Sequence, residues 1–256
     1  MEFFDSHSHY NDEKFEEDRE ELIHKIYQEG ITKTVVAGYD VLSSKKAILL
    51  AEQYHFIYAT CGISPNDIPG NTEEIFSLAK HDKVVAVGEI GLDYYWNKEN
   101  KKEQKEIFCE QIEIANQLRK PIVIHAREAV QDIIEVLKEK PVDEKGVFHC
   151  IQLNPELVKQ ALKLDFFVSF AGSITFKNSK NADEIIKMVP IEKMLIETDC
   201  PYLAPEPVRG TRNDSRNVKY TAQKIAQVKQ KELEEIARIT YQNAETIFKI
   251  NELKKK

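Results

Sequence analysis

The sequence predicts an α/β protein, a single (β/α)8 barrel of the TIM type that occupies residues 1–256. Two observations lead to this prediction. Eight short apolar, β-branched segments recur along the chain, and stretches with helical periodicity separate them. Near-continuous apolar runs are typical of parallel strands, which are covered on both faces. The alternative, an open doubly wound sheet, would call for a glycine-rich GxGxxG turn after an early strand, and the sequence has none.

The expected strands are, in chain order, residues 2–7, 33–39, 57–63, 84–90, 121–126, 145–150, 166–172 and 194–199. Helical faces are clearest in residues 16–29, 104–119, 128–138 and 156–164, where apolar positions recur every three or four residues. The longest connections follow the fourth strand, from Leu92 to about Glu103, and the eighth strand, over 201–217. Long loops on a barrel usually carry function.

Composition narrows the class of protein. The chain has 43 acidic and 36 basic side chains and a formal charge of −7, so any grip on nucleic acid has to be local. No apolar run approaches the length of a membrane span, and the opening MEFFDSHSH lacks the features of a secretory signal. The four cysteines are dispersed without a CxxC pair, which indicates reduced thiols. We therefore expect a cytoplasmic protein with no membrane association and no obligate protein partner.

Metal-ligating residue types gather at the expected carboxyl ends of the strands, the face where barrel enzymes have their active sites. They are His7, His9, Glu89, His125, His149 and Asp199. His7 and His9 are two residues apart on a strand, so both imidazoles point the same way. Six ligands exceed what one tetrahedral ion needs and suit two divalent cations bridged by Glu89. The mixture of imidazole and carboxylate leaves Mg²⁺, Mn²⁺ and Zn²⁺ open.

Each of these residues also has a structural interpretation on its own. A strand-end histidine can be a satisfied core residue, Glu89 can pair with a lysine, and Asp199 can form a turn before Pro201. Their joint occurrence at one rim favours the metal site. The other histidines, His24, His55 and His81, are expected on the surface, and Asp5 is expected to support the ligands from below rather than bind metal. Cys150 and Cys200 are each adjacent to a ligand and are expected to serve packing.

The string Phe4-Asp5-Ser6-His7-Ser8-His9 resembles the FDxHxH opening of the TatD-type metal-dependent deoxyribonucleases, within the amidohydrolase-like barrel superfamily. Matching motifs follow in order as GEIGLDYYW (88–96), PIVIHAREA (121–129), VFHC (147–150), SFAGSITFKN (169–178), ETDCPYLAP (197–205) and RGTRN (209–213). The resemblance therefore spans nearly the whole chain. It implies that His7, His9, Glu89 and Asp199 hold one ion, and that Glu89, His125 and His149 hold a second.

Two departures from that family's pattern affect the substrate more than the chemistry. The family often carries GxHP after strand three, where this chain has Gly62-Ile63-Ser64-Pro65. After strand six it often shows HCFSG, where this chain reads His149-Cys150-Ile151-Gln152-Leu153. The metal set is untouched, but groups that contact the substrate differ.

The expected reaction is hydrolysis of a phosphodiester by a water activated by two metals, with Glu89 as the bridge and Asp199 as the general base. A phosphate backbone needs cationic partners, and an unpaired base needs an aromatic face. The candidates for these contacts are Arg127, Lys177, Arg209, Arg212, Tyr94, Tyr95 and Trp96. We expect a DNA exonuclease that trims single-stranded or frayed ends.

Two alternatives remain at this point. The same barrel and metals can hydrolyse an ester or amide, for example in a D-aminoacyl-tRNA deacylase-like activity, because fold and metal set do not determine the substrate. A metal-stabilised barrel can also serve as a non-catalytic module that binds a protein partner.

Overall fold

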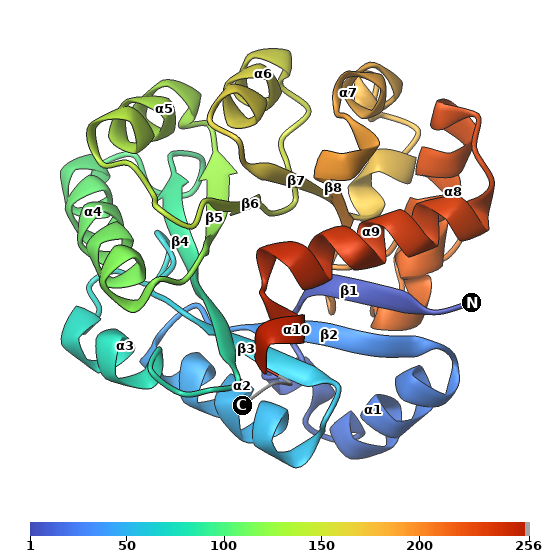
Figure 1. Cartoon of the computed structure of the whole chain (residues 1–256), viewed down its shortest axis with the longest axis horizontal. Helices are drawn as coiled ribbons and strands as arrows, with labels where there is room; N and C mark the ends of the chain where they lie inside the picture. The colour runs from blue at the N-terminus through green and yellow to red at the C-terminus, as the bar shows by residue number, and fades with distance from the viewer. Residues whose placement is uncertain (254–256) are drawn as a thin grey trace.

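The computed structural model describes residues 1–253. In this range eight parallel strands form one sheet in which each strand is hydrogen-bonded to the next, in the order β1 to β8 (Figure 1). The strands are β1 (Phe3–Ser8), β2 (Ile31–Ala37), β3 (Ile57–Cys61), β4 (Val84–Asp93), β5 (Ile122–Arg127), β6 (Gly146–Phe148), β7 (Phe167–Phe170) and β8 (Met194–Ile196). A parallel bridge between Ser8 and Cys200 joins the first strand to the segment after the last one. The predicted (β/α)8 barrel is therefore confirmed.

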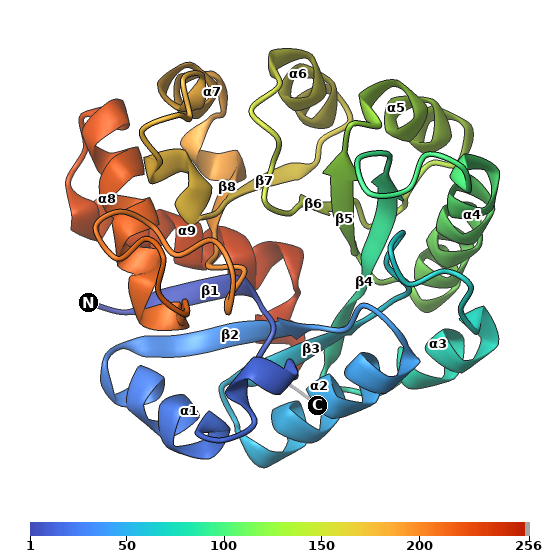
Figure 2. The same ribbon diagram turned by 180° about the vertical axis from the view of Figure 1, so that it is seen from behind.

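Helices alternate with the strands and surround them, as Figure 2 shows from the opposite side. They are α1 (Arg19–Gln28), α2 (Val41–Gln53), α3 (Thr72–Leu78), α4 (Lys101–Leu118), α5 (Val130–Glu139), α6 (Pro155–Lys163), α7 (Ala182–Met188), α8 (Val218–Lys229), α9 (Leu233–Ile247) and α10 (Ile250–Leu253). The four helices expected from periodicity are confirmed as α1, α4, α5 and α6, with ends shifted by up to three residues. None of the helices in the described range is long and apolar enough to cross a membrane.

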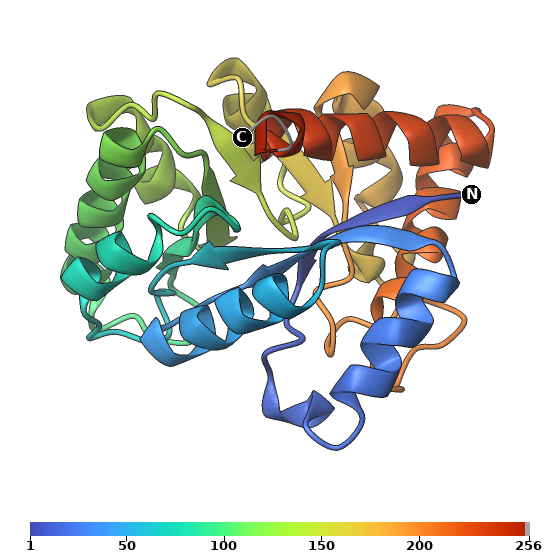
Figure 3. The same ribbon diagram turned by 60° about the horizontal axis from the view of Figure 1, so that its bottom comes forward.

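Two apolar layers hold the barrel together. Alternate strand residues point inward or outward, so Val35 belongs to the interior cluster and its neighbour Val36 to the layer beneath the helices. The interior cluster takes one or more residues from every strand and also includes Phe248 and Ile250, from the chain around α9 and α10. These two helices lie across the amino-terminal end of the barrel, opposite the loop that follows β1 (Figure 3). The opposite end is left for the carboxyl ends of the strands.

The strand ends differ from the prediction at β4 and β8. β4 continues to Asp93, with a register shift against β5 between Val87 and Ile90, so Glu89 lies within the strand and not at its end. The connection to α4 is correspondingly shorter than expected, at residues 94–100. Gly91 has a φ of +140°, and a Cβ there would lie 2.1 Å from the carbonyl oxygen of His125. Only glycine allows this approach, which brings β4 close to His125. β8 ends at Ile196, three residues before Asp199.

Candidate metal centre

The barrel brings all six predicted ligands together at the carboxyl end of its strands. They come from β1 and the residue after it (His7, His9), from β4 (Glu89), from β5 (His125), from the residue after β6 (His149) and from the loop after β8 (Asp199). Backbone hydrogen bonds hold the three residues that lie beyond strands, and the N–H of His9 donates to the carbonyl of Cys200 at 2.8 Å. The N–H of Asp199 donates to the carbonyl of His7 at 3.0 Å, and the N–H of His149 donates to the carbonyl of Ile124 at 3.1 Å.

One group of ligand atoms surrounds a point beside β1. Nε2 of His7 lies 3.1 Å from Nε2 of His9 and 3.4 Å from Oε2 of Glu89. Nε2 of His9 lies 3.2 Å from Oδ1 of Asp199. Ligand atoms around one tetrahedral ion with bonds of about 2.0–2.1 Å are separated by roughly 3.3 Å. The spacing of these four side chains therefore fits a single bound cation.

A second group surrounds the other oxygen of Glu89. Oε1 lies 2.8 Å from Nδ1 of His125 and 3.2 Å from Nε2 of His149, and the two ring nitrogens are 3.3 Å apart. Each carboxylate oxygen of Glu89 thus faces a different pair of imidazoles. This arrangement is the one expected of a carboxylate that bridges two ions.

The donor chemistry also fits divalent cations. His7 is completely buried and directs Nε2 at His9, Glu89 and Asp199. Four imidazoles that point unshared nitrogens toward two carboxylates form a set of N and O donors, which suits the divalent first-row metals. Nothing in the described part of the chain supplies a lysine or arginine that would neutralise Glu89 instead; its ion-pair partners there are all histidines.

Buried charges keep the two carboxylates of this set in their ligand form. Burial by itself would raise the pKa of Glu89, but the charge of His149 and the hydrogen bond from His125 hold that pKa well below its usual range. Burial would likewise raise the pKa of Asp199, and the hydrogen bond from His9 lowers it. Burial would lower the pKa of His149, yet the charge of Glu89 raises it well above its ordinary value. Both carboxylates are therefore ionised, and a cation that binds His149 would displace the proton favoured there by Glu89.

Two further carboxylates orient the histidines of the second group, and the sequence prediction did not include them. Oδ2 of Asp93 lies 2.9 Å from Nε2 of His125, the ring nitrogen that faces away from Glu89. Oε1 of Glu197 lies 3.4 Å from Nδ1 of His149 and accepts the N–H of Cys150 at 2.8 Å. A carboxylate behind a metal-ligating histidine fixes the ring and raises its basicity. The sequence could have indicated Asp93 through its spacing from Glu89, because residues four apart on a strand lie on the same face.

Asp5 acts from below the centre, on the loop that carries Asp199. Its carboxylate accepts the N–H of Thr198 at 2.9 Å and the hydroxyl of Ser215 at 2.6 Å. Burial raises the pKa of Asp5 to about 7. The Asp5 carboxylate is hydrogen-bonded to Thr198 and Ser215 and to none of the ligand side chains. The position agrees with the supporting role expected from sequence.

The residues expected to contact substrate fall into different environments. The guanidinium of Arg127 lies 3.9 Å over the ring of Tyr95 and 5.4 Å from that of Trp96, which are 47% and 68% exposed. Lys177 is exposed, and the guanidinium of Arg209 lies 4.2 Å over the ring of the adjacent Phe176. These residues are accessible, as substrate contacts have to be.

Tyr94 needs correction. Tyr94 is buried and its hydroxyl donates to Asp132 at 2.6 Å, because strand β4 extends further than expected and turns this ring into the packing beside α5. It has no face free for a base. Arg212 forms an exposed ion pair with Asp18 and donates to the carbonyl of Lys14 at 2.8 Å. Its role as a phosphate contact stays a prediction.

The remaining histidines and cysteines behave as predicted. His24 and His55 are exposed, and His81, partly exposed, lies 3.0 Å from Glu52. All four cysteines are free. Burial and the charge of Asp199 raise the pKa of Cys150 well above its ordinary value, which favours the thiol over the thiolate.

Comparison with known proteins identifies the family. The sequence matches the family described as TatD related DNase over residues 4–249. The chain belongs to the TatD family. It is 44% identical to the uncharacterized metal-dependent hydrolase YabD of Bacillus subtilis over 253 residues, 97% of this chain and 99% of YabD. Over 207 residues it is 38% identical to the uncharacterized metal-dependent hydrolase YcfH of Escherichia coli K12, 79% of this chain and 77% of YcfH.

Solved structures agree with this TatD assignment at the level of fold. The barrel matches the crystal structure of YJJV, a TatD homologue from Escherichia coli K12, with a TM-score of 0.89 at 24% identity, over 96% of this chain and 98% of that one. A dihydroorotase crystal structure matches with a TM-score of 0.61 at 16% identity, over 97% of this chain and 72% of that one. Together, the family and the ligand clusters make this protein a metal-dependent hydrolase.

Proposed function

We propose that this hydrolase cleaves phosphodiester bonds at the ends of single-stranded or frayed DNA, with two divalent cations bridged by Glu89. The observation that supports this most directly is the division of the Glu89 carboxylate, whose Oε2 faces His7 and whose Oε1 faces His125. Paired cations about 3.5–4 Å apart are the common arrangement in phosphodiester hydrolysis. The family description as a DNase supports the same substrate class.

The cations and Asp199 would have different roles in the reaction. Bound cations would polarise the attacking water and neutralise charge on the phosphate oxygens. Asp199 is ionised because of its contact with His9. Its Oδ2 has no hydrogen bond within the described residues, whereas Oδ1 faces the imidazoles, so Oδ2 is the atom that accepts the proton of the attacking water.

The contacts around the mouth favour an end over a long duplex. Arg127 presents a guanidinium to a phosphate, and the exposed ring of Trp96 beside it can stack on an unpaired base. Lys177 and Arg209 add two more exposed cations on the loops after β7 and β8. Because the chain carries a net charge of −7, a long duplex would meet repulsion away from these few cations.

A substrate comparison tests the proposal. End-labelled single-stranded DNA, incubated with the protein and Mg²⁺, Mn²⁺ or Zn²⁺, should shorten stepwise, and a blunt duplex of the same sequence should shorten more slowly. Protein dialysed against a chelator should leave both intact. If DNA stays intact with every metal while an aminoacyl-tRNA or a small amide is hydrolysed, the ester or amide hydrolase replaces the nuclease.

The bridge role of Glu89 has its own test. In Glu89→Gln the side chain keeps its size but loses the charge that faces both pairs of histidines. We expect turnover to fall by more than about a hundredfold and the metal content, measured by mass spectrometry, to drop below that of the wild type. Far-UV circular dichroism should not change, and the exposed Glu52→Gln serves as the control. A fully loaded, active Glu89→Gln protein would contradict the bridge.

A further inference from the structure

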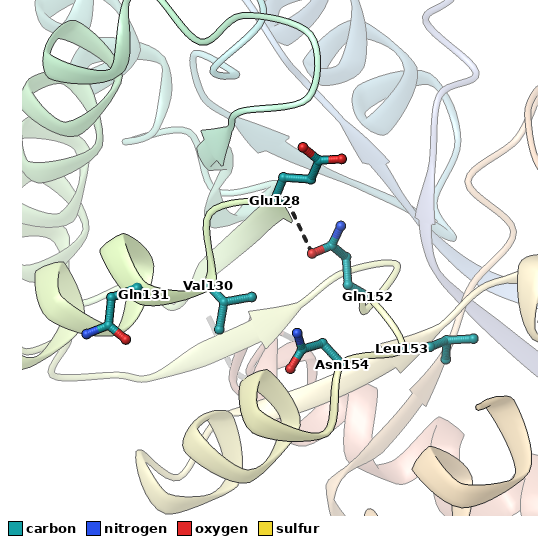
Figure 4. A pocket seen from close by; sticks show the side chains of 6 residues that line it. All are labelled: Glu128, Val130, Gln131, Gln152, Leu153 and Asn154. Atoms are coloured by element: carbon teal, nitrogen blue, oxygen red, sulfur yellow. Dashed lines mark hydrogen bonds between the residues drawn. The ribbon is translucent and has the colours of Figure 1, made fainter. Parts of the chain in front are cut away.

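A separate pocket of about 560 Å³ lies between the loops that precede α5 and α6 (Figure 4). It is lined by Glu128, Val130, Gln131, Gln152, Leu153 and Asn154. Its volume falls within the range of about 300–1,000 Å³ that is usual for small-molecule sites. The metal chemistry proposed above makes no use of it.

Two polar groups of the pocket are available to a ligand. Oε1 of Gln152 accepts the backbone N–H of Glu128 at 3.3 Å, which leaves the Nε2 amide without a hydrogen bond among the described residues. The Glu128 carboxylate and that amide nitrogen lie at the same edge of the pocket, and both point away from Val130 and Asn154 (Figure 4). The ion pair of Glu128 with Lys98, at 3.5 Å, joins two exposed side chains and costs little to break. The edge of the pocket therefore offers two acceptor oxygens and a donor.

The backbone at Glu128 has an uncommon conformation. Its φ is 53°, in the left-handed region, as is that of eight other non-glycine residues in the described range. Such conformations persist where surrounding contacts hold them, and they cluster at functional sites. Here the hydrogen bond to Gln152 holds the residue. By contrast, Asn154 is occupied as the cap of α6, where its Oδ1 accepts the N–H groups of Glu156 and Leu157.

The chain places this pocket next to the second pair of histidines. Glu128 is three residues after His125, and Gln152 is three residues after His149. Three residues span at most about 10 Å, which is comparable with the reach of one nucleotide from its phosphate to the edge of its base. Arg127 immediately precedes Glu128 and lies flat on Tyr95. A nucleotide whose phosphate lies at the metal centre can thus place its base in the pocket.

We propose that the pocket is a subsite for a guanine base at the strand end, an inference that rests on the proposed function. Guanine is the base that presents two neighbouring donors, N1–H and N2–H₂, beside the acceptor O6. The two oxygens of Glu128 match the donors, and Nε2 of Gln152 matches O6. Adenine and cytosine place a ring acceptor next to their amino group, and thymine flanks its N–H with two carbonyls. A carboxylate meets an acceptor lone pair on each of those three edges.

Equilibrium binding without metal tests this subsite independently of hydrolysis. Fluorescence anisotropy would compare chelator-treated protein with labelled oligothymidylates that carry guanine, hypoxanthine, adenine or thymine at both ends. Hypoxanthine keeps N1–H and O6 but lacks the N2 amino group. We expect the hypoxanthine-ended strand to bind about tenfold more weakly than the guanine-ended strand, the effect of one hydrogen bond to a charged group.

Variants distinguish the pocket from general DNA affinity. In Glu128→Gln, which keeps the shape but replaces an acceptor by a donor, guanine and hypoxanthine ends should bind equally. Gln152→Glu should weaken guanine binding, because a second carboxylate repels O6. Lys98→Gln removes only the ion-pair partner and should keep the preference. Equal affinity for guanine and hypoxanthine ends in the wild type, or a preference that survives Glu128→Gln, would overturn the subsite.

Failure of the nuclease and failure of the guanine subsite would give different experimental results. If guanine ends bind preferentially but are not hydrolysed with any divalent metal, the subsite holds and the nuclease does not. If ends are hydrolysed without regard to the terminal base and bind equally, the nuclease holds and the guanine subsite does not.

Discussion

Glu89 and Asp93 lie four residues apart on β4 and act on opposite sides of the same histidine. Oε1 of Glu89 lies 2.8 Å from Nδ1 of His125, and Oδ2 of Asp93 lies 2.9 Å from its Nε2. The hydrogen bond to His125 and the N–H of Trp96 hold the pKa of Asp93 at about 2, although burial opposes this shift. The His125 ring is thus held between two ionised carboxylates, one of which directs its other nitrogen to the metal centre.

The variant Asp93→Asn tests this support. The amide keeps the shape and loses the charge behind His125, so affinity for the weaker-bound cation should fall by about 10–100-fold. Competition with a chromogenic chelator measures the change. Asp132→Asn is the matched control, because Asp132 is bonded to the buried Tyr94 and touches no ligand. Unchanged metal affinity in Asp93→Asn would remove the supporting role.

At the scale of elements, the connection between β4 and α4 is fixed at its base and open at its tip. Gln104 of α4 accepts the N–H of Asp93 at 2.9 Å and donates to the carbonyl of Asn97 at 3.1 Å. Oδ1 of Asp93 also accepts the N–H groups of Tyr95 and Trp96, at 2.9 and 3.1 Å. The backbone is therefore anchored while the rings of Tyr95 and Trp96 remain exposed beside Arg127. A pre-ordered aromatic surface loses little entropy when a base stacks on it.

Fluorescence reports on this loop directly, because Trp96 is the single tryptophan of the chain. Single-stranded DNA added to metal-free protein should quench it through stacking. An abasic strand with the same phosphates should bind about tenfold more weakly, since stacking contributes about 1–3 kcal/mol per base. Equal quenching by both strands would show that the loop contacts the phosphates and does not stack on a base.

Across the whole molecule, stability and chemistry lie at opposite ends of the barrel. The carboxyl end holds the ligands, and the amino end is closed by α9 and α10. Phe248 from that closing segment is 1% exposed and packs against Phe4, with ring centroids 6.2 Å apart. The same strands run through both ends, but the side chains that pack at the amino end are not those that form the metal centre.

Phe248→Ala should therefore lower the free energy of unfolding by about 3–5 kcal/mol without changing metal stoichiometry at a temperature where the protein is folded. Urea unfolding followed by circular dichroism measures the first quantity and mass spectrometry the second. Leu49→Ala, on the outer face of α2 and 62% exposed, should change stability by less than about 0.5 kcal/mol. Loss of metal from folded Phe248→Ala protein would show that the two ends are coupled.

The sequence by itself determined the strand–helix alternation and the six candidate ligands that lie together in the structure, because hydrophobic period and the alternation of side chains along a strand are local properties of the chain. It did not reveal that Tyr94 is buried against Asp132, that Arg212 is paired with Asp18, or that Glu197 lies behind His149. Those contacts join segments far apart in sequence, and only the closed barrel brings them within reach. The pocket of Glu128 and Gln152 belongs to the same class. Its two walls follow different strands, and the spacing between them depends on how neighbouring strands pair.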